Sequence, residues 1–102
     1  MMDLVFEWDD EKEQKNLRLH GLEFETATRV FFDPRRIERY DKDSSIGEDR
    51  YQTMGVYENV LFVVYTERGN VTRIISARKA EPFERRIYYG NSEIHGWERV
   101  AP

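Results

Sequence analysis

Cysteine is absent from this chain of 102 residues. Without thiols the chain has no disulfide framework, no thiolate nucleophile and no zinc–thiolate site. Long apolar runs are missing as well, because no window approaches the roughly 18 apolar residues that a membrane-spanning helix needs. The N-terminus MMDLVFEWDD also lacks the basic region and apolar run of a signal peptide. We therefore expect a cytoplasmic protein that does not contact a membrane.

Histidine is scarce, with only two in the chain, and they do not lie at the helical spacing of a transition-metal pair. The acidic stretch DKDSSIGED, residues 41–49, could suggest calcium. An EF-hand loop that began at Asp41 would need glycine at its sixth position and glutamate at its twelfth, where this chain has Ile46 and Gln52. We therefore expect no metal and no cofactor.

The composition that remains is 39% hydrophobic and 14% aromatic, which fits one compact domain with a modest core. The net charge is −4, but it is unevenly distributed. Residues 1–49 carry 8 basic and 14 acidic side chains, whereas residues 50–90 carry 7 basic and 4 acidic ones. Phosphate binding depends on local potential, so a basic face on an acidic protein is one interpretation. Ordinary fluctuation of charge along the chain is the other.

The first third of the chain has the pattern of one strand and two helices. LVFEW, residues 4–8, is aromatic and β-branched and predicts a strand, after which Asp9 or Asp10 can cap a helix over residues 11–20. That helix should end at His20, with Gly21 as its left-handed cap. Residues 23–32 place Phe24, Ala27 and Phe31 on one helical face, and Asp33-Pro34 ends the second helix.

Beyond Pro34 the pattern is that of strands, followed by a short helix over residues 83–89. The expected strands are residues 37–41, 49–57, 60–66 and 71–77, and the turns between the last three are short enough to join antiparallel neighbours. VLFVVYT, residues 60–66, is apolar on both faces and should be a buried central strand. We therefore predict an α+β fold, in which a curved antiparallel sheet has two N-terminal helices packed on one face and a short C-terminal helix.

Three segments carry a resemblance to a known family: FEWDDEKEQKNLRLHGLEFETA, GEDRY and RIISARKAEPFERRIYY. With their motifs H-G-L-x-F, I-S-A-R and E-R-R-x-Y, they resemble the BrnT family of bacterial ribonuclease toxins, over roughly residues 4–89. The resemblance implies a RelE-like fold and a toxin of a type II toxin–antitoxin pair that cleaves RNA without metal. It also implies a cognate ribbon-helix-helix antitoxin, similar to BrnA, in a two-plus-two heterotetramer that reaches DNA only through the antitoxin.

Metal-free RNA cleavage needs a base for the ribose 2′-OH, an acid for the leaving 5′-oxygen and cations for the phosphorane. The predicted catalytic residues are His20, Arg73, Arg78 and Glu84. The predicted RNA-binding residues are Arg50, Lys79, Arg85 and Arg86. Because side chains alternate along a strand, Arg73 and Lys79 should share a face that Arg78 does not, unless a bulge near Ala77 changes its direction.

Each of these residues also has a purely structural interpretation. Arg73 could be a cross-strand partner of Glu67, and His20 could complement the dipole of the helix that it ends. Glu84 could be a capping carboxylate, and Arg50 could pair with Glu48 on the same strand face. Solvation alone could explain the remaining basic residues, which are Arg78 and Lys79 at a strand end and Arg85 and Arg86 on a helix.

The pattern divides the chain into one toxin-like domain over residues 1–90 and a tail over residues 91–102. The tail contains Ile94, His95 and Trp97, and we expect it to pack on the domain or on a neighbouring chain. The competing functional hypothesis is a protein-binding module with weak or no catalysis that acts mainly through its complex with the antitoxin.

Overall fold

The computed structural model describes residues 4–100, so the predictions for residues 1–3 and 101–102 lie outside the described part. Its helices and strands are, in chain order, β1 (Val5–Trp8), α1 (Asp10–His20), α2 (Phe24–Thr28), the 3-10 helix η1 (Arg29–Phe32), β2 (Ile37–Tyr40), β3 (Arg50–Tyr57), β4 (Asn59–Arg68), β5 (Val71–Lys79), α3 (Pro82–Tyr89), the 3-10 helix η2 (Ser92–His95) and β6 (Glu98–Arg99).

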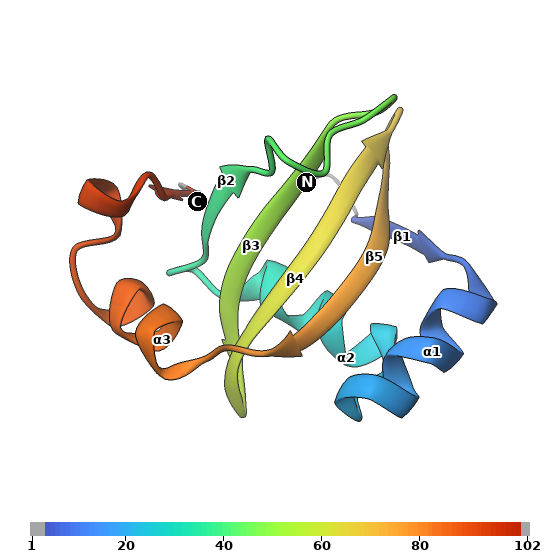
Figure 1. The fold of residues 1–102 in the computed structure, drawn as a ribbon, viewed down its shortest axis with the longest axis horizontal. Coiled ribbons are helices and arrows are strands. Elements are labelled where there is room, and N and C mark those ends of the chain that lie inside the picture. The colour runs from blue at the N-terminus through green and yellow to red at the C-terminus, as the bar shows by residue number, and fades with distance from the viewer. Residues whose placement is uncertain (1–3, 101–102) are drawn as a thin grey trace.

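The strands form one curved sheet in the order β1-β5-β4-β3-β2-β6 (Figure 1). Strands β2 to β5 are the predicted antiparallel meander, and β4 lies at its centre with Leu61 and Val63 almost completely buried. The α+β prediction is confirmed. The sheet is mixed, however, because β1 pairs with β5 in parallel. Parallel partners need a long connection, and here the connection is most of the chain, which local sequence patterns do not report.

Local chemistry explains where the N-terminal helices begin and end. The side chain of Asp9 accepts a hydrogen bond from the Lys12 N–H at 3.0 Å, and Gly21 closes α1 with φ of 69°. The predicted second helix is split into α2 and η1. Its buried side chains are Phe24, Ala27 and Val30, so its apolar face lies against the sheet.

The sheet has a separate hydrophobic core on each face. One core joins α2 and η1 to Leu61, Val63 and Tyr65 of β4. The other joins Tyr88 of α3 and Trp97 of the C-terminal segment to Phe62 and to neighbouring strand residues. The C-terminal helix therefore packs on the face opposite to α2, at the side of the sheet, and leaves the middle of β3, β4 and β5 without a helix in front (Figure 1). We call this uncovered middle the open face.

Strand β5 contains a bulge that decides which of its side chains reach the open face. Tyr65 pairs with Ile74 and Val64 pairs with Ser76, so Ile75 has no partner on β4. Arg73 lies opposite Thr66 and Arg78 lies opposite Phe62, and these β4 residues share one face. The bulge therefore places Arg73 and Arg78 on the same face and Lys79 on the other. Alternation without a bulge predicts that Arg73 and Lys79 share a face and that Arg78 does not. The bulge that would change this prediction is present, at Ile75.

Asn16 joins α1 to β5 beyond the end of β1. Its side-chain amide donates to the Ala77 carbonyl at 2.8 Å and accepts from the Ala77 N–H at 3.1 Å. Asn16 is buried, and these two bonds replace the ladder bonds that β1 would have made at this point of the sheet edge. They fix the last turn of α1 next to the C-terminal half of β5.

Residues 91–100 pack on the rest of the fold. Trp97 is 2% exposed and meets Phe62 edge to face, and β6 extends the sheet beside β2. The Val100 N–H also donates to the Arg36 carbonyl at 3.0 Å. Among residues 4–100, no helix is long and apolar enough to cross a membrane.

Candidate active site

Arg78 and Glu84 form the most closely connected pair of charges on the open face. Arg78 leaves the end of β5, and Glu84 lies in the first turn of α3, where its Oε1 also accepts from the Glu81 N–H at 2.8 Å. The two side chains meet through two parallel hydrogen bonds, Nη1 to Oε1 at 2.7 Å and Nη2 to Oε2 at 2.9 Å. The predicted capping role of Glu84 and its place beside Arg78 are therefore both present.

Other contacts fix the plane of the Arg78 guanidinium. Its carbon lies 4.2 Å from the centre of the Phe62 ring, and Nη1 also donates to the Lys79 carbonyl at 3.2 Å. An arginine has five N–H donors. Within the described residues, Arg78 uses two on Nη1 and one on Nη2, which leaves Nε–H and the second Nη2–H on the same edge. That edge is a free fork with the geometry that two phosphate oxygens accept.

The electrostatics of this pair keep both groups charged. Burial raises the pKa of Glu84, but the hydrogen bonds from Arg78 and from the Glu81 N–H, together with the charges of Arg78 and Arg39, outweigh it and leave the pKa below its usual value. The hydrogen bonds to Glu84 raise the pKa of Arg78, although burial opposes them. Glu84 is thus a carboxylate that holds a cation in place, and it carries no proton to donate near neutral pH.

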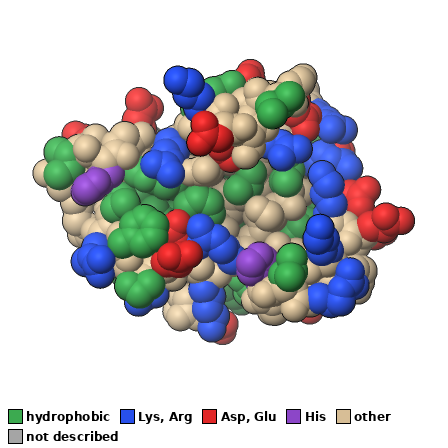
Figure 2. Space-filling model, viewed as in Figure 1, with side chains coloured by type: hydrophobic (Ala, Val, Ile, Leu, Met, Phe, Trp, Pro, Cys, Tyr) green, Lys and Arg blue, Asp and Glu red, His purple; other side chains and the backbone are tan. Residues whose placement is uncertain are grey.

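His20 ends α1, four residues after Asn16, and its side chain is exposed. Since Asn16 is bonded to the residue before Arg78, the C-terminal end of α1 lies at the same end of β5 as Arg78 (Figure 1). Figure 2 shows histidine at two separate places on the face that carries the open sheet. Within residues 4–100, no hydrogen bond or ion pair joins His20 to Arg78 or Glu84.

The other predicted residues do not gather at Arg78. Arg73 lies five residues earlier on β5, about 16 Å away at the usual strand rise, and it forms a salt bridge with Glu7 of β1 rather than with Glu67. Arg50 lies 4.0 Å from Glu48, as its structural interpretation predicts. Lys79 is exposed on the opposite face. Arg85 donates to the Ala80 carbonyl at 3.0 Å, and Arg86 is exposed on α3.

Arg39 is a site residue that the sequence interpretation missed. It lies on β2 near Glu84, and its charge helps to lower the pKa of that carboxylate. Its Nε donates to the Gln52 side chain at 2.7 Å, and its guanidinium carbon lies 4.5 Å from the centre of the Trp97 ring. Ile37 is buried on the face of the sheet that carries α3, and alternation along β2 places Arg39 on that same face. The sequence pattern therefore contained the information that Arg39 lies on the side of Glu84.

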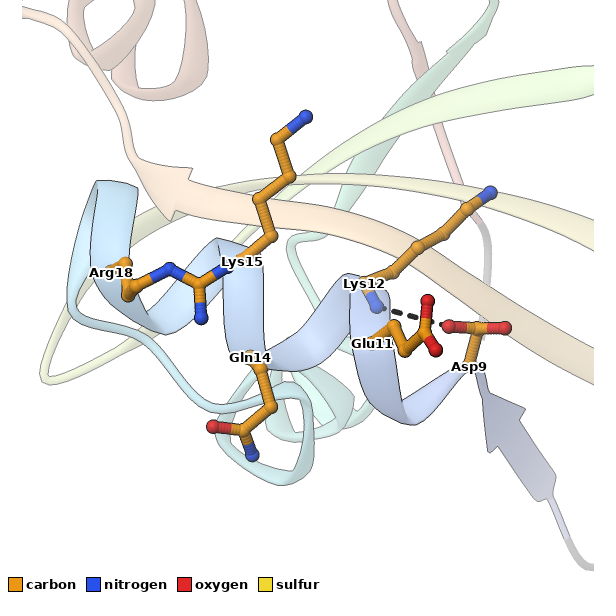
Figure 3. Close-up of a pocket in the computed structure, with 6 residues that line it drawn as sticks. All are labelled: Asp9, Glu11, Lys12, Gln14, Lys15 and Arg18. Carbon is orange, nitrogen blue, oxygen red and sulfur yellow. Dashed lines mark hydrogen bonds between the residues drawn. The ribbon is translucent and has the colours of Figure 1, made fainter.

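A shallow hollow lies along the outer side of α1 (Figure 3). Lys12, Lys15 and Arg18 line it at intervals of three residues, together with Asp9, Glu11 and Gln14. It has no histidine and no ion pair with the geometry of Arg78 and Glu84. We interpret these side chains as a solvated basic surface of α1 at the side of the open face, where Figure 2 also shows Lys and Arg side chains.

No group of three or more histidine, aspartate and glutamate side chains in residues 4–100 has an arrangement that could hold a metal ion.

Comparison with known proteins identifies the family. Residues 8–84 match the family described as the ribonuclease toxin BrnT of type II toxin–antitoxin systems. No curated protein matches the chain significantly. Among solved structures, the chain is similar to the crystal structure of the Brucella abortus ribonuclease toxin BrnT, with a TM-score of 0.59 and 23% identity. That match covers 78% of this chain and 99% of the Brucella chain, and at this identity it supports the fold. The family match spans most of the chain, and the chain therefore belongs to the BrnT family of ribonuclease toxins of type II toxin–antitoxin systems.

Proposed function

We propose that this chain is a metal-independent endoribonuclease that binds RNA on the open face and cleaves it beside Arg78. The observation that carries the proposal is the geometry of Arg78. Glu84 and Phe62 fix its guanidinium, and one fork of two N–H donors remains free. A cation oriented in advance stabilises charge that develops in a transition state better than a mobile cation does, because it needs no reorganisation.

In the proposed reaction, the free fork of Arg78 binds two non-bridging oxygens of the scissile phosphate. The ribose 2′-oxygen attacks phosphorus and loses its proton to a base, and the bond from phosphorus to the 5′-oxygen breaks as that oxygen gains a proton. The products are a 2′,3′-cyclic phosphate and a 5′-hydroxyl end. Arg78 stabilises the additional negative charge of the phosphorane, and Glu84 acts as a positioning residue for Arg78.

We assign proton transfer to His20, because it is an exposed imidazole at the same end of β5. Glu84 is less suited to this step, since its lowered pKa makes it a weak base and its two oxygens already accept three hydrogen bonds. The 2′-hydroxyl and the leaving oxygen lie on opposite sides of the phosphorus atom, and solvent water can serve the side that His20 does not reach.

A toxin of a type II system has an antitoxin partner. We propose that this partner is a ribbon-helix-helix protein, that the two form a two-plus-two heterotetramer in the cytoplasm, and that the toxin reaches DNA only through it. The exposed cations of the open face support this, because an acidic partner segment would neutralise them and block RNA in the same step.

The test is expression of the parent and two variants, alone and with the neighbouring gene. Arg78→Ala should abolish growth arrest and reduce RNA cleavage by about a hundredfold, because a cation that stabilises developing charge contributes on the order of 3 kcal/mol. Arg29→Ala is the matched control. Arg29 also lies beside an aromatic ring, with its guanidinium carbon 5.9 Å from the centre of the Tyr57 ring, but it is exposed and lies in η1 on the other face.

Arg29→Ala should stay toxic, and all three proteins should co-purify with the neighbouring product at a one-to-one ratio. If Arg78→Ala arrests growth as strongly as the parent does, Arg78 has no part in the reaction. Complex formation by a parent that cleaves no RNA would instead favour a protein-binding module.

A further inference from the structure

A second group of cations lies beside the Arg78–Glu84 pair, in a hollow between α3 and the C-terminal segment. Its volume is about 410 Å³, and its lining residues are Arg39, Phe83, Arg86, Ile87 and His95. The reaction proposed above uses none of these side chains. The hollow adjoins the site, because Phe83, which lines it, directly precedes Glu84 in the first turn of α3. The charge of Arg39 also acts on Glu84.

Arg39 has the properties of a binding residue rather than of a structural one. The bond from its Nε to Gln52 and the contact with the Trp97 ring fix the side chain. Neither contact neutralises its charge, and within residues 4–100 no carboxylate lies within 4.0 Å of its guanidinium. Its Nη1 and Nη2 groups have no protein acceptor in the described part of the chain. Arg39 is therefore a fixed cation with free donors that point to solvent.

Phe83 and Arg86 supply the opposite wall from α3. They are three residues apart, which makes them neighbours on one side of a helix. The Phe83 side chain is 51% exposed, although the helix has a buried side available to large apolar residues, such as the one that Tyr88 uses. An exposed aromatic ring next to two unneutralised arginines offers a stacking surface for a base and donors for the phosphate that follows it.

We propose that this hollow is a second RNA subsite, which holds one nucleotide next to the cleaved bond. Arg39 and Arg86 bind its phosphate, Phe83 stacks on its base, and His95 contributes a hydrogen-bonding group at the rim. The inference rests on the proposed function, because it assumes that the scissile phosphate lies at Arg78. The combination of an aromatic face with two cations fits a nucleotide better than an acidic peptide, which needs only the cations.

The subsite also depends on the part of the chain that the family match does not include. Arg86 and His95 lie beyond residue 84, and so does Trp97, on which Arg39 stacks. Residues 85–100 thus supply Arg86, Ile87 and His95 to the lining of the hollow, and Trp97 in this segment also holds Arg39 in place. In this protein the C-terminal segment extends the RNA-binding surface of the domain.

The experiment compares two RNAs that contain the same cleavage site, once the parent has been used to map that site. One is a dinucleotide with only the scissile phosphate, and the other is an octanucleotide that also fills the hollow. Arg86→Ala should raise KM for the octanucleotide about tenfold, in keeping with one lost charge-assisted contact, and leave kcat unchanged. Arg39→Gln should raise KM by a similar factor, but it also removes a charge that acts on Glu84, so its kcat is not a readout of the subsite. Phe83→Ala should have a similar effect through lost stacking, and Phe83→Tyr should restore binding.

Arg86→Ala and Phe83→Ala should not change cleavage of the dinucleotide, and Arg29→Ala should change neither reaction. Arg86 makes no hydrogen bond or ion pair through its side chain in residues 4–100, so Arg86→Ala tests the subsite without disturbing the fold. A parent that cleaves neither RNA refutes the proposed function. A parent that cleaves both, with Arg86→Ala and Phe83→Ala unchanged in KM, refutes only the subsite. Unchanged KM with a weakened antitoxin complex would show that the hollow binds protein instead.

Discussion

At the scale of single residues, the arginines on the open face differ in whether a carboxylate neutralises them. Arg50 and Arg73 are paired with Glu48 and Glu7, away from the site. Arg78 is paired with Glu84 but keeps a free fork, and Arg39 is fixed by uncharged groups alone. Since an anion competes with whatever already neutralises a cation, Arg78 and Arg39 are the residues of this set best prepared for phosphate.

The Arg78–Glu84 pair makes a prediction about pH and stability. The pKa of Glu84 is below its usual value of 4.5 in the folded state, so ionisation of Glu84 stabilises the fold. This contribution is fully present above the pKa of the unfolded chain and is lost as pH falls through the folded pKa. Glu84→Gln should therefore lower the free energy of unfolding by about 2 kcal/mol at pH 7, the size expected for hydrogen bonds to a charged group.

The difference between Glu84→Gln and the parent should shrink as pH falls below about 4.5, because the parent carboxylate then takes up a proton. Urea unfolding followed by circular dichroism at pH 7 and pH 3 measures both values. Glu25→Gln is the control, since Glu25 is exposed on α2 and forms no ion pair within residues 4–100. A difference that stays constant between the two pH values would show that folding does not lower the pKa of Glu84.

At the scale of elements, β5 organises the site. Its bulge at Ile75 sends Arg73 and Arg78 to the open face, and its end leads directly into α3, which carries Glu84. On its outer edge β5 is covered first by β1 and then by the Asn16 side chain. The two hydrogen bonds to Ala77 therefore help to position α1, and His20 at its end.

Replacement of Asn16 tests this arrangement. Asn16→Ala removes both partners of a buried backbone group at Ala77, and we expect a loss of about 2 to 4 kcal/mol in the free energy of unfolding. Gln14→Ala, on the exposed side of the same helix, should change stability by less than about 0.5 kcal/mol. Chemical denaturation of both variants provides the comparison, and equal stability of the two would contradict the role given to Asn16.

Much of this element pattern can be predicted from the sequence, because alternation and short turns are local signals. The meander over β2 to β5, the caps at Asp9 and Gly21 and the C-terminal helix all follow from neighbouring residues. The bulge at Ile75 does not, since it depends on how β4 and β5 align. The same is true of the partner of Arg73: Glu7 is 66 residues away, whereas Glu67 lies on the neighbouring strand opposite Thr72 and therefore on the other face of the sheet. Arg39 is a third case. Alternation along β2 indicates the face on which it lies, but its contact with Trp97, about 60 residues later, cannot be predicted from neighbouring residues.

At the scale of the whole molecule, the chain is acidic, yet basic side chains gather on its open face. The net charge is −4, yet cations gather on the open face and along α1, and several acidic side chains act as their partners or as helix caps (Figure 2). The helices α2 and η1 close one face of the sheet, and α3 and the C-terminal segment cover only the side of the other. In the function proposed here, an RNA strand lies on this surface, across the ends of α1, β5 and α3.

The most direct test of the central claim, metal-independent cleavage at Arg78, is the chemistry of the cut ends. The purified parent should cleave an RNA oligonucleotide at the same rate with and without EDTA, and mass spectrometry should find a 2′,3′-cyclic phosphate and a 5′-hydroxyl. An oligonucleotide with one 2′-deoxyribose at the mapped site should not be cut there, and Arg78→Ala should cut the normal RNA about a hundredfold more slowly. Cleavage that EDTA abolishes, or that continues at the 2′-deoxy position, would contradict the account.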